Sequence, residues 1–122
     1  IVVPGCGVDE AERLAERLRQ RLATQEFLFE GERRGHLSCS LGVCCHAFLA
    51  GGASAAFEQA LGLAERALDA AKRTSRNAWV LCGPGQEVPS QILNLELHVE
   101  ELADAGWLRV TSSLPKGHPI QW

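Results

Sequence analysis

The chain has 122 residues, a formal net charge of −3 at pH 7 and an apolar share of 46%. This length suits one domain, or one domain with an appendage, and the apolar share allows a modest core. The net negative charge gives no reason to expect general affinity for nucleic acid. No run of 18 apolar residues is present, so we expect no membrane-spanning helix in this segment.

The five cysteines form no C-x-x-C pair, so a zinc site is not expected. We interpret them as small hydrophobic side chains in a reducing cytosol, which predicts a cytoplasmic location. The four histidines are scattered and show no metal-ligand spacing, so no metal site is predicted. The cysteines are Cys6, Cys39, Cys44, Cys45 and Cys82.

The N-terminal part of the chain is expected to contain a strand and a helix. Residues 1–3 have the character of a strand remnant, and residues 4–7 form a Pro/Gly turn. Residues 8–23 place apolar side chains at helical spacing, with acidic residues in the first turn where the helix dipole favours them. The apolar positions are Val8, Ala11, Leu14, Ala15, Leu18 and Leu22.

A hairpin is predicted next. Residues 26–30 form a short strand, and residues 31–35 a charged turn. Apolar and small or polar side chains alternate over residues 36–46, which is typical of a half-buried strand. We expect these two strands to pair with each other.

A second helix and a buried strand follow a loop of small residues at 49–54. Apolar residues recur every three or four positions from Phe57 to Ala71, which predicts a helix over residues 55–74. The short apolar run at residues 78–82 is expected to be a strand.

The remainder of the chain is expected to form a short α-β appendage. Residues 83–89 have the composition of a linker. A third helix is predicted from about residue 90 to Gly106, with Ile92, Leu95, Val99 and Leu102 facing inward. A short strand at residues 107–110 precedes a dozen residues that we expect to be loosely ordered.

The end of the second helix carries the strongest functional signal. Residues 64–77 have the sequence A-E-R-A-L-D-A-A-K-R-T-S-R-N, in which the helix leads into a basic elbow, residues 72–77. Lys72 and Arg76 would share a face if the last helical turn persists, and cations there suit phosphate. This segment resembles the end of a GGDEF domain, the nucleotide-cyclase-like module of diguanylate cyclases, whose pattern is roughly A-D-x-A-L-Y-x-A-K-x-x-G-R-N.

Two further segments extend this resemblance over residues 1–82. Residues 40–43 (S-L-G-V) resemble the family's S-[IV]-G-[VI] strand, and residues 15–19 (A-E-R-L-R) resemble the helix after the signature hairpin. The element order fits a ferredoxin-like α+β sheet, which is also the broad type of the GGDEF fold. We therefore expect residues 1–82 to be the C-terminal part of a GGDEF-like domain, and residues 83–122 to be a linker, helix and tail.

The resemblance implies three binding residues. Lys72 and Arg76 match positions that contact the triphosphate of GTP, and Arg17 matches an arginine of the inhibitory cyclic di-GMP site. The alternative is that all three are ordinary solvated cations. Ser75 replaces the family's glycine, and Asp69 replaces its tyrosine, close enough to Lys72 to offset its charge. These departures indicate a degenerate domain.

The resemblance implies no catalytic or metal-binding residue within this chain. Family members use two Mg²⁺ ions held by acidic residues of the GGDEF signature and of an early strand, and neither position is among the 122 residues. Mg²⁺ and GTP are therefore cofactors only if the full domain is active.

A sheet without its first strands has open edges, so we expect self-association or pairing with an upstream segment. A proteolytic remnant is the third explanation.

Three functions remain open at this point. The first is a degenerate, regulatory or nucleotide-binding part of a cyclic di-GMP signalling protein. The second is a fragment of an active diguanylate cyclase whose catalytic half lies upstream. The third is a structural dimerisation module.

The purified 122-residue chain is expected to form no cyclic di-GMP from GTP and Mg²⁺. The reason is that the acidic metal-binding positions implied by the resemblance are not among its residues. Chromatography of the reaction mixture after prolonged incubation measures the product. Product above the level of a no-protein control contradicts the prediction.

Overall fold

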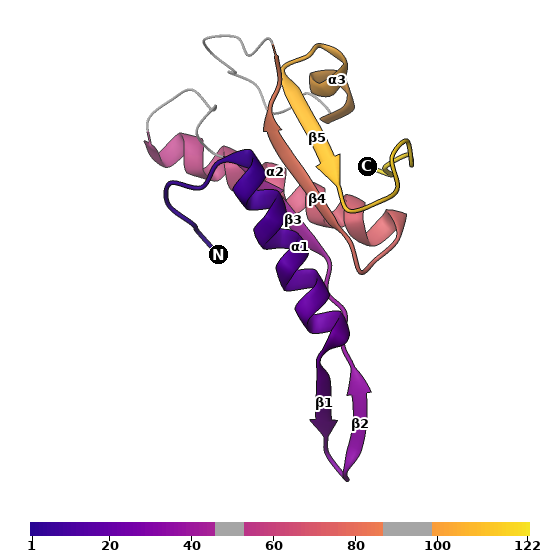
Figure 1. The fold of residues 1–122 in the computed structure, drawn as a ribbon. Coiled ribbons are helices and arrows are strands. Elements are labelled where there is room, and N and C mark those ends of the chain that lie inside the picture. The colour runs from indigo at the N-terminus through magenta and orange to yellow at the C-terminus, as the bar shows by residue number, and fades with distance from the viewer. Residues whose placement is uncertain (46–52, 87–98) are drawn as a thin grey trace.

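The computed structural model describes residues 1–45, 53–86 and 99–122. These residues form an α+β fold, as the sequence predicts (Figure 1). No helix among them is long and apolar enough to cross a bilayer. The elements in chain order are α1 (Val8–Thr24), β1 (Glu26–Phe29), β2 (Arg33–His36), β3 (Leu41–Cys44), α2 (Ala53–Thr74), β4 (Trp79–Pro84), α3 (Val99–Asp104) and β5 (Leu108–Ser112).

A three-stranded sheet lies at the centre of the fold, in the order β3-β4-β5. Strand β3 runs parallel to β4, with Leu41 opposite Trp79. Strand β5 runs antiparallel to β4, with Val110 opposite Cys82. The middle strand β4 therefore has a neighbour on each side, and its main chain is paired along both edges.

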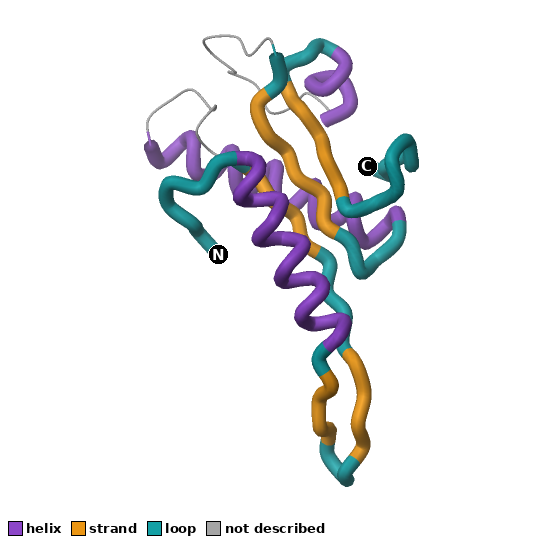
Figure 2. Tube along the Cα trace, viewed as in Figure 1, coloured by secondary structure: helices purple, strands orange, loops and turns teal. Residues whose placement is uncertain are grey.

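The sheet has a helix on each face. Side chains alternate between the two faces of a strand, so Trp79 and Leu81 point to one side of β4, and Val80 and Cys82 to the other. Trp79 and Leu81 pack with Ala11 and Ala15 of α1. Figure 2 shows α1 in purple alongside the orange strands of the sheet. The core on the α2 side is formed by Ala60, Leu63, Ala67, Ala71, Val80, Cys82, Val99, Leu102 and Leu108.

The close packing of β3 against α2 explains why the third position of the S-L-G-V segment is a glycine, Gly42. A Cβ atom at Gly42 would collide with the carbonyl oxygen of Ala64 and the backbone nitrogen of Leu68, and would lie 2.8 Å from the Cα of Leu68. All three atoms belong to the main chain of α2, which cannot rotate away as a side chain can. Strand β3 and helix α2 therefore approach so closely that only a residue without a side chain fits.

The predicted hairpin exists, but its second strand was placed wrongly. Strand β1 pairs with β2, from Glu26 opposite His36 to Phe29 opposite Arg33, and the hairpin extends beyond the end of α1 (Figure 1). Gly31 and Glu32 have positive φ angles of 79° and 63°, so the chain reverses within a short turn and the charged residues that follow already belong to the strand. Of the strand expected over residues 36–46, only His36 belongs to β2, and Leu41–Cys44 form β3 of the central sheet; residue 46 lies outside the described residues.

Two other expectations for strands and linkers are corrected. Residues 1–3 do not form a strand; Ile1 and Val2 are exposed and pair with none of the described strands. Their side chains favour a strand, but a strand also needs a partner for its main-chain hydrogen bonds. The linker expected from Gly83 begins later, because Gly83 and Pro84 still pair with Arg109 and Leu108.

The C-terminal segment is anchored instead of loosely ordered. The half-buried side chains of Ile120 and Trp122 pack against the α2 side of the core. The N–H of Gln121 donates a hydrogen bond of 2.9 Å to Oγ1 of Thr74, at the end of α2. Two apolar side chains and one main-chain donor thus hold a segment whose proline and glycine content suggested disorder.

The appendage predicted after residue 82 is in contact with the rest of the chain. The inward-facing positions Val99 and Leu102 of the third helix are buried, as predicted, in the same core as Val80. The earlier positions of that helix, Ile92 and Leu95, lie outside the described residues. The division of the chain at residue 82 stays a prediction.

Replacing Gly42 with Ala is expected to lower the free energy of unfolding by at least about 2 kcal/mol, because the new methyl group forces main-chain segments of β3 and α2 apart. Urea denaturation measures the change. The matched control is Gly62→Ala, within α2, where a Cβ meets nothing within 4 Å. That variant should gain roughly 0.5–1 kcal/mol from helix propensity. Equal stability of the two variants would contradict the close approach.

Candidate functional site

The basic elbow, residues 72–77, connects the end of α2 to the start of β4. Helix α2 ends at Thr74, and the N–H groups of Ser75 and Arg76 both donate to the carbonyl oxygen of Ala71, at 3.2 and 2.9 Å. The next two residues are left-handed, with φ angles of 57° at Arg76 and 46° at Asn77. The chain then enters β4 with Trp79, so the elbow turns sharply within a few residues.

The two predicted phosphate-binding residues lie at this elbow, and both are exposed. Lys72 belongs to the last turn of α2, whereas Arg76 lies beyond the end of the helix. The positive φ angles are found at Arg76 and Asn77, and Ser75 is not among the residues with positive φ. The replacement of the family's glycine by Ser75 therefore does not require a left-handed serine. Binding of phosphate by Lys72 and Arg76 stays a prediction.

Arg17 lies on the exposed side of α1. The opposite side of this helix carries Ala11 and Ala15, which are buried against the sheet. An exposed guanidinium at this position is accessible to an anionic ligand. Its proposed contact with cyclic di-GMP stays a prediction.

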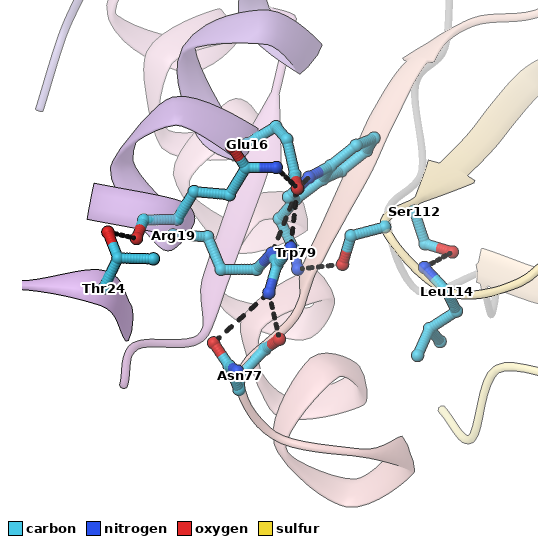
Figure 3. A network of polar contacts seen from close by, with 9 residues as sticks. Glu16, Arg19, Thr24, Asn77, Trp79, Ser112 and Leu114 are labelled. Atoms are coloured by element: carbon cyan, nitrogen blue, oxygen red, sulfur yellow. Dashed lines mark hydrogen bonds and ion pairs between the residues drawn. The ribbon is translucent and has the colours of Figure 1, made fainter. Parts of the chain in front are cut away.

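A polar network that the sequence did not reveal joins α1 to the elbow (Figure 3). Arg19 donates to Glu16 through Nε, at 3.0 Å, and through Nη2, at 2.6 Å. Nη1 of Arg19 reaches both the main-chain oxygen of Asn77, at 3.4 Å, and its side-chain Oδ1, at 3.5 Å. Oε2 of Glu16 also accepts a hydrogen bond of 2.8 Å from Nε1 of Trp79. One Glu–Arg pair thus contacts both the elbow and the strand that follows it.

Glu16 is the charged centre of this network. Its carboxylate accepts hydrogen bonds from Arg19 and Trp79, and a third of 2.7 Å from Nε2 of Gln20. The Arg19 contact, with help from the Trp79 and Gln20 hydrogen bonds and against the effect of burial, lowers the pKa of Glu16 from 4.5 to about 2. The carboxyl group therefore stays ionised throughout the physiological range and stabilises the pair only in that form.

The sequence contains two local signals for this network. Glu16 and Arg19 are three residues apart on a helix, which is the spacing of an ion pair. Trp79 lies within a buried apolar run, where an indole N–H needs an acceptor. Neither signal identifies the partner, because Trp79 is 63 residues from Glu16 in the chain.

The described residues do not fit a Mg²⁺ site. In the part of the chain that the structure describes, no three His, Cys, Asp or Glu side chains are grouped so as to hold a metal ion. Glu16 is engaged by protein donors, and Oε1 of Glu12 accepts a hydrogen bond of 2.7 Å from Thr111.

The cysteines are free thiols. Cys44 and Cys82 face each other across β3 and β4, on the α2 side of the sheet. Burial raises the pKa of Cys82 to about 12, and raises that of Cys44 as well. Both thiols are therefore neutral at physiological pH, and they act as small hydrophobic side chains, as the sequence predicts.

Comparison with known proteins identifies the family. The family model described as "Diguanylate cyclase, GGDEF domain" matches residues 1–78. The chain belongs to the GGDEF domain family. The match covers α1, Gly42 and the whole basic elbow of this GGDEF domain, and it confirms the resemblance found in the sequence. No curated protein and no solved structure matches the chain.

The Glu16→Gln variant is expected to be about 1 kcal/mol less stable than wild type at pH 7, a value reduced for the partial exposure of the pair. The folded-state pKa of Glu16 lies below its unfolded value, so the carboxylate stabilises the fold above pH 4.5 and loses this effect as the pH falls to about 2. Urea denaturation at several pH values between 2 and 7 should therefore show that the free energies of unfolding of wild type and Glu16→Gln become equal as the pH falls.

The matched control for this pH series is Glu65→Gln, at an exposed position of α2. It should stay within about 0.5 kcal/mol of wild type at every pH. If the free energy of unfolding of Glu16→Gln differs from that of wild type by the same amount at every pH down to 2, the ion pair does not stabilise the fold.

Proposed function

We propose that this chain is a degenerate, regulatory part of a GGDEF domain in a cyclic di-GMP signalling protein, and that it binds guanine nucleotide through Lys72 and Arg76. The observation that carries the proposal is the position of these two cations. Both are exposed, both lie at one elbow, and the elbow lies within the part of the chain that matches the family. A triphosphate needs fixed cations, and a guanidinium can bind two oxygens at once.

Three substitutions support the degenerate state. Ser75, Glu65 and Asp69 replace the glycine, aspartate and tyrosine of the family's pattern. Asp69 is exposed on α2, three residues before Lys72, where its negative charge reduces the attraction of the elbow for phosphate. GTP and Mg²⁺ are the cofactors of active family members. For this chain we propose binding of nucleotide without turnover.

Arg17 is the proposed contact for cyclic di-GMP. Its exposure on α1 supports the proposal, because the ligand carries two phosphate charges and can reach the guanidinium from solvent. The free thiols support the cytoplasmic location that forms part of the same proposal.

A structural dimerisation module is the second candidate function. In the described sheet β3 is an edge strand, with β4 on one side only. Ile1 and Val2 are exposed near the start of the chain, and Leu28 of the hairpin is 71% exposed. Open edges and exposed apolar side chains favour pairing with a second copy or with another segment of the protein.

Replacing both Lys72 and Arg76 with Ala is expected to weaken guanine-nucleotide binding while leaving stability within about 0.5 kcal/mol of wild type. Each lost charged contact should cost roughly 1.5–3 kcal/mol of binding free energy. Calorimetric titration with GTP and with cyclic di-GMP at fixed salt, together with a melting curve, measures both effects.

The matched control is the double variant Arg33→Ala and Arg34→Ala, which removes the same charge from exposed positions of the hairpin. It should bind nucleotide almost as well as wild type. If the wild type binds neither nucleotide, or if both double variants lose the same affinity, Lys72 and Arg76 are ordinary helix-end cations. The dimerisation module then becomes the better function.

A further inference from the structure

We propose that Arg19, oriented by Glu16, is a positioning residue that holds the basic elbow in the conformation that presents Arg76. This inference rests on the proposed function, because it concerns the same phosphate-binding site. It adds a residue of α1 to a site that the sequence pattern confines to the end of α2.

The elbow needs support from outside because its main chain is strained. Arg76 and Asn77 are consecutive residues with left-handed φ angles, and neither is glycine. A non-glycine residue in this region is destabilised by contacts of its Cβ atom with the main chain, although asparagine tolerates the conformation better than most. A strained conformation of this kind persists only where the surroundings fix it.

Arg19 provides a contact of the required kind. Its Nη1 lies between the main-chain oxygen and the side-chain oxygen of Asn77, so a single guanidinium nitrogen fixes two atoms of one left-handed residue. These distances, 3.4 and 3.5 Å, are long for single hydrogen bonds, and two together restrict the residue more than either alone. Asn77 follows Arg76 directly, so restraining Asn77 limits the direction in which the Arg76 side chain leaves the elbow.

Glu16 fixes Arg19 in turn. The Glu16 carboxylate holds two nitrogens of the Arg19 guanidinium, and it is itself held by the indole N–H of Trp79. Trp79 is only 7% exposed, and its indole packs with Ala11 and Ala15, so this end of the network is rigid. Helix α1 therefore contacts this segment at two points: Arg19 binds Asn77, and Glu16 binds Trp79, two residues further along the chain (Figure 3).

The experiment compares GTP binding and elbow conformation in Arg19→Ala, Arg19→Lys and the wild type. Calorimetric titration at fixed salt gives the affinity, and the three-bond amide couplings of Arg76 and Asn77 in NMR spectra report their φ angles. We expect both variants to lose affinity on the order of tenfold and to show altered couplings at both residues. Lysine keeps the charge but lacks the planar fork, so it should not restore binding.

The control for charge is Arg13→Ala, at an exposed position of the same helix. It removes one positive charge without touching the network, and its affinity and couplings should equal those of the wild type. Full restoration of binding by Arg19→Lys would show that Arg19 acts only through its charge, and would overturn the positioning role. Wild-type affinity in both Arg19 variants would overturn it as well.

The outcome also separates this inference from the proposed function. If the wild type binds no GTP, the proposed function fails, and the couplings alone then decide whether Arg19 holds the elbow. Unchanged couplings in Arg19→Lys overturn the inference in that case too. If the Arg19 variants fail to fold, the test uses Glu16→Gln, which leaves Arg19 in place but loosens it. This variant should show a smaller loss of GTP affinity and smaller changes in the couplings. Wild-type affinity and couplings in Glu16→Gln would overturn the inference.

Discussion

The burial of β4 on both faces is the constraint on which the other features of this fold depend. Its side chains alternate between a core formed with α1 and a core formed with α2, so both helices must lie across the same strand. Gly42 allows α2 to approach the neighbouring strand at main-chain distance. Only residues 75–78 connect the end of α2 to the start of β4, and two of them, Arg76 and Asn77, have left-handed φ angles.

The helices were predictable from the sequence because their signal is local. Each carries a stripe of apolar residues at a spacing that only a helix aligns, and the predicted ranges 8–23 and 55–74 differ from α1 and α2 by two residues or fewer at each end. The hairpin was not predictable to the same degree. The alternation over residues 36–46 is real, but it does not say which strand is the partner, and the positive φ of Glu32 places the charged Arg33 and Arg34 in β2.

The candidate site was predictable only in part, for a related reason. Lys72 and Arg76 lie in one short motif, so a resemblance over 14 residues is enough to single them out. The contact that holds the elbow joins residues 58 positions apart, and nothing in the spacing of Glu16 and Arg19 indicates that Asn77 is the second partner of the pair. A local pattern singles out candidate residues, whereas the arrangement of the fold decides which other residues position them.

The elbow is also held from its other end, by residues beyond the family match. Thr74, the last residue of α2, accepts a hydrogen bond from the main chain of Gln121, and Trp122 packs against the same helix's core. Strand β5 covers the second edge of β4, and Ser113 binds the main-chain N–H of Trp79 through its hydroxyl. The family match ends at residue 78. Residues 108–122, which lie beyond the match, nevertheless contact the chain on both sides of the elbow, in addition to the contacts from α1. Changes in this C-terminal segment should therefore be transmitted to Lys72 and Arg76 without altering either residue.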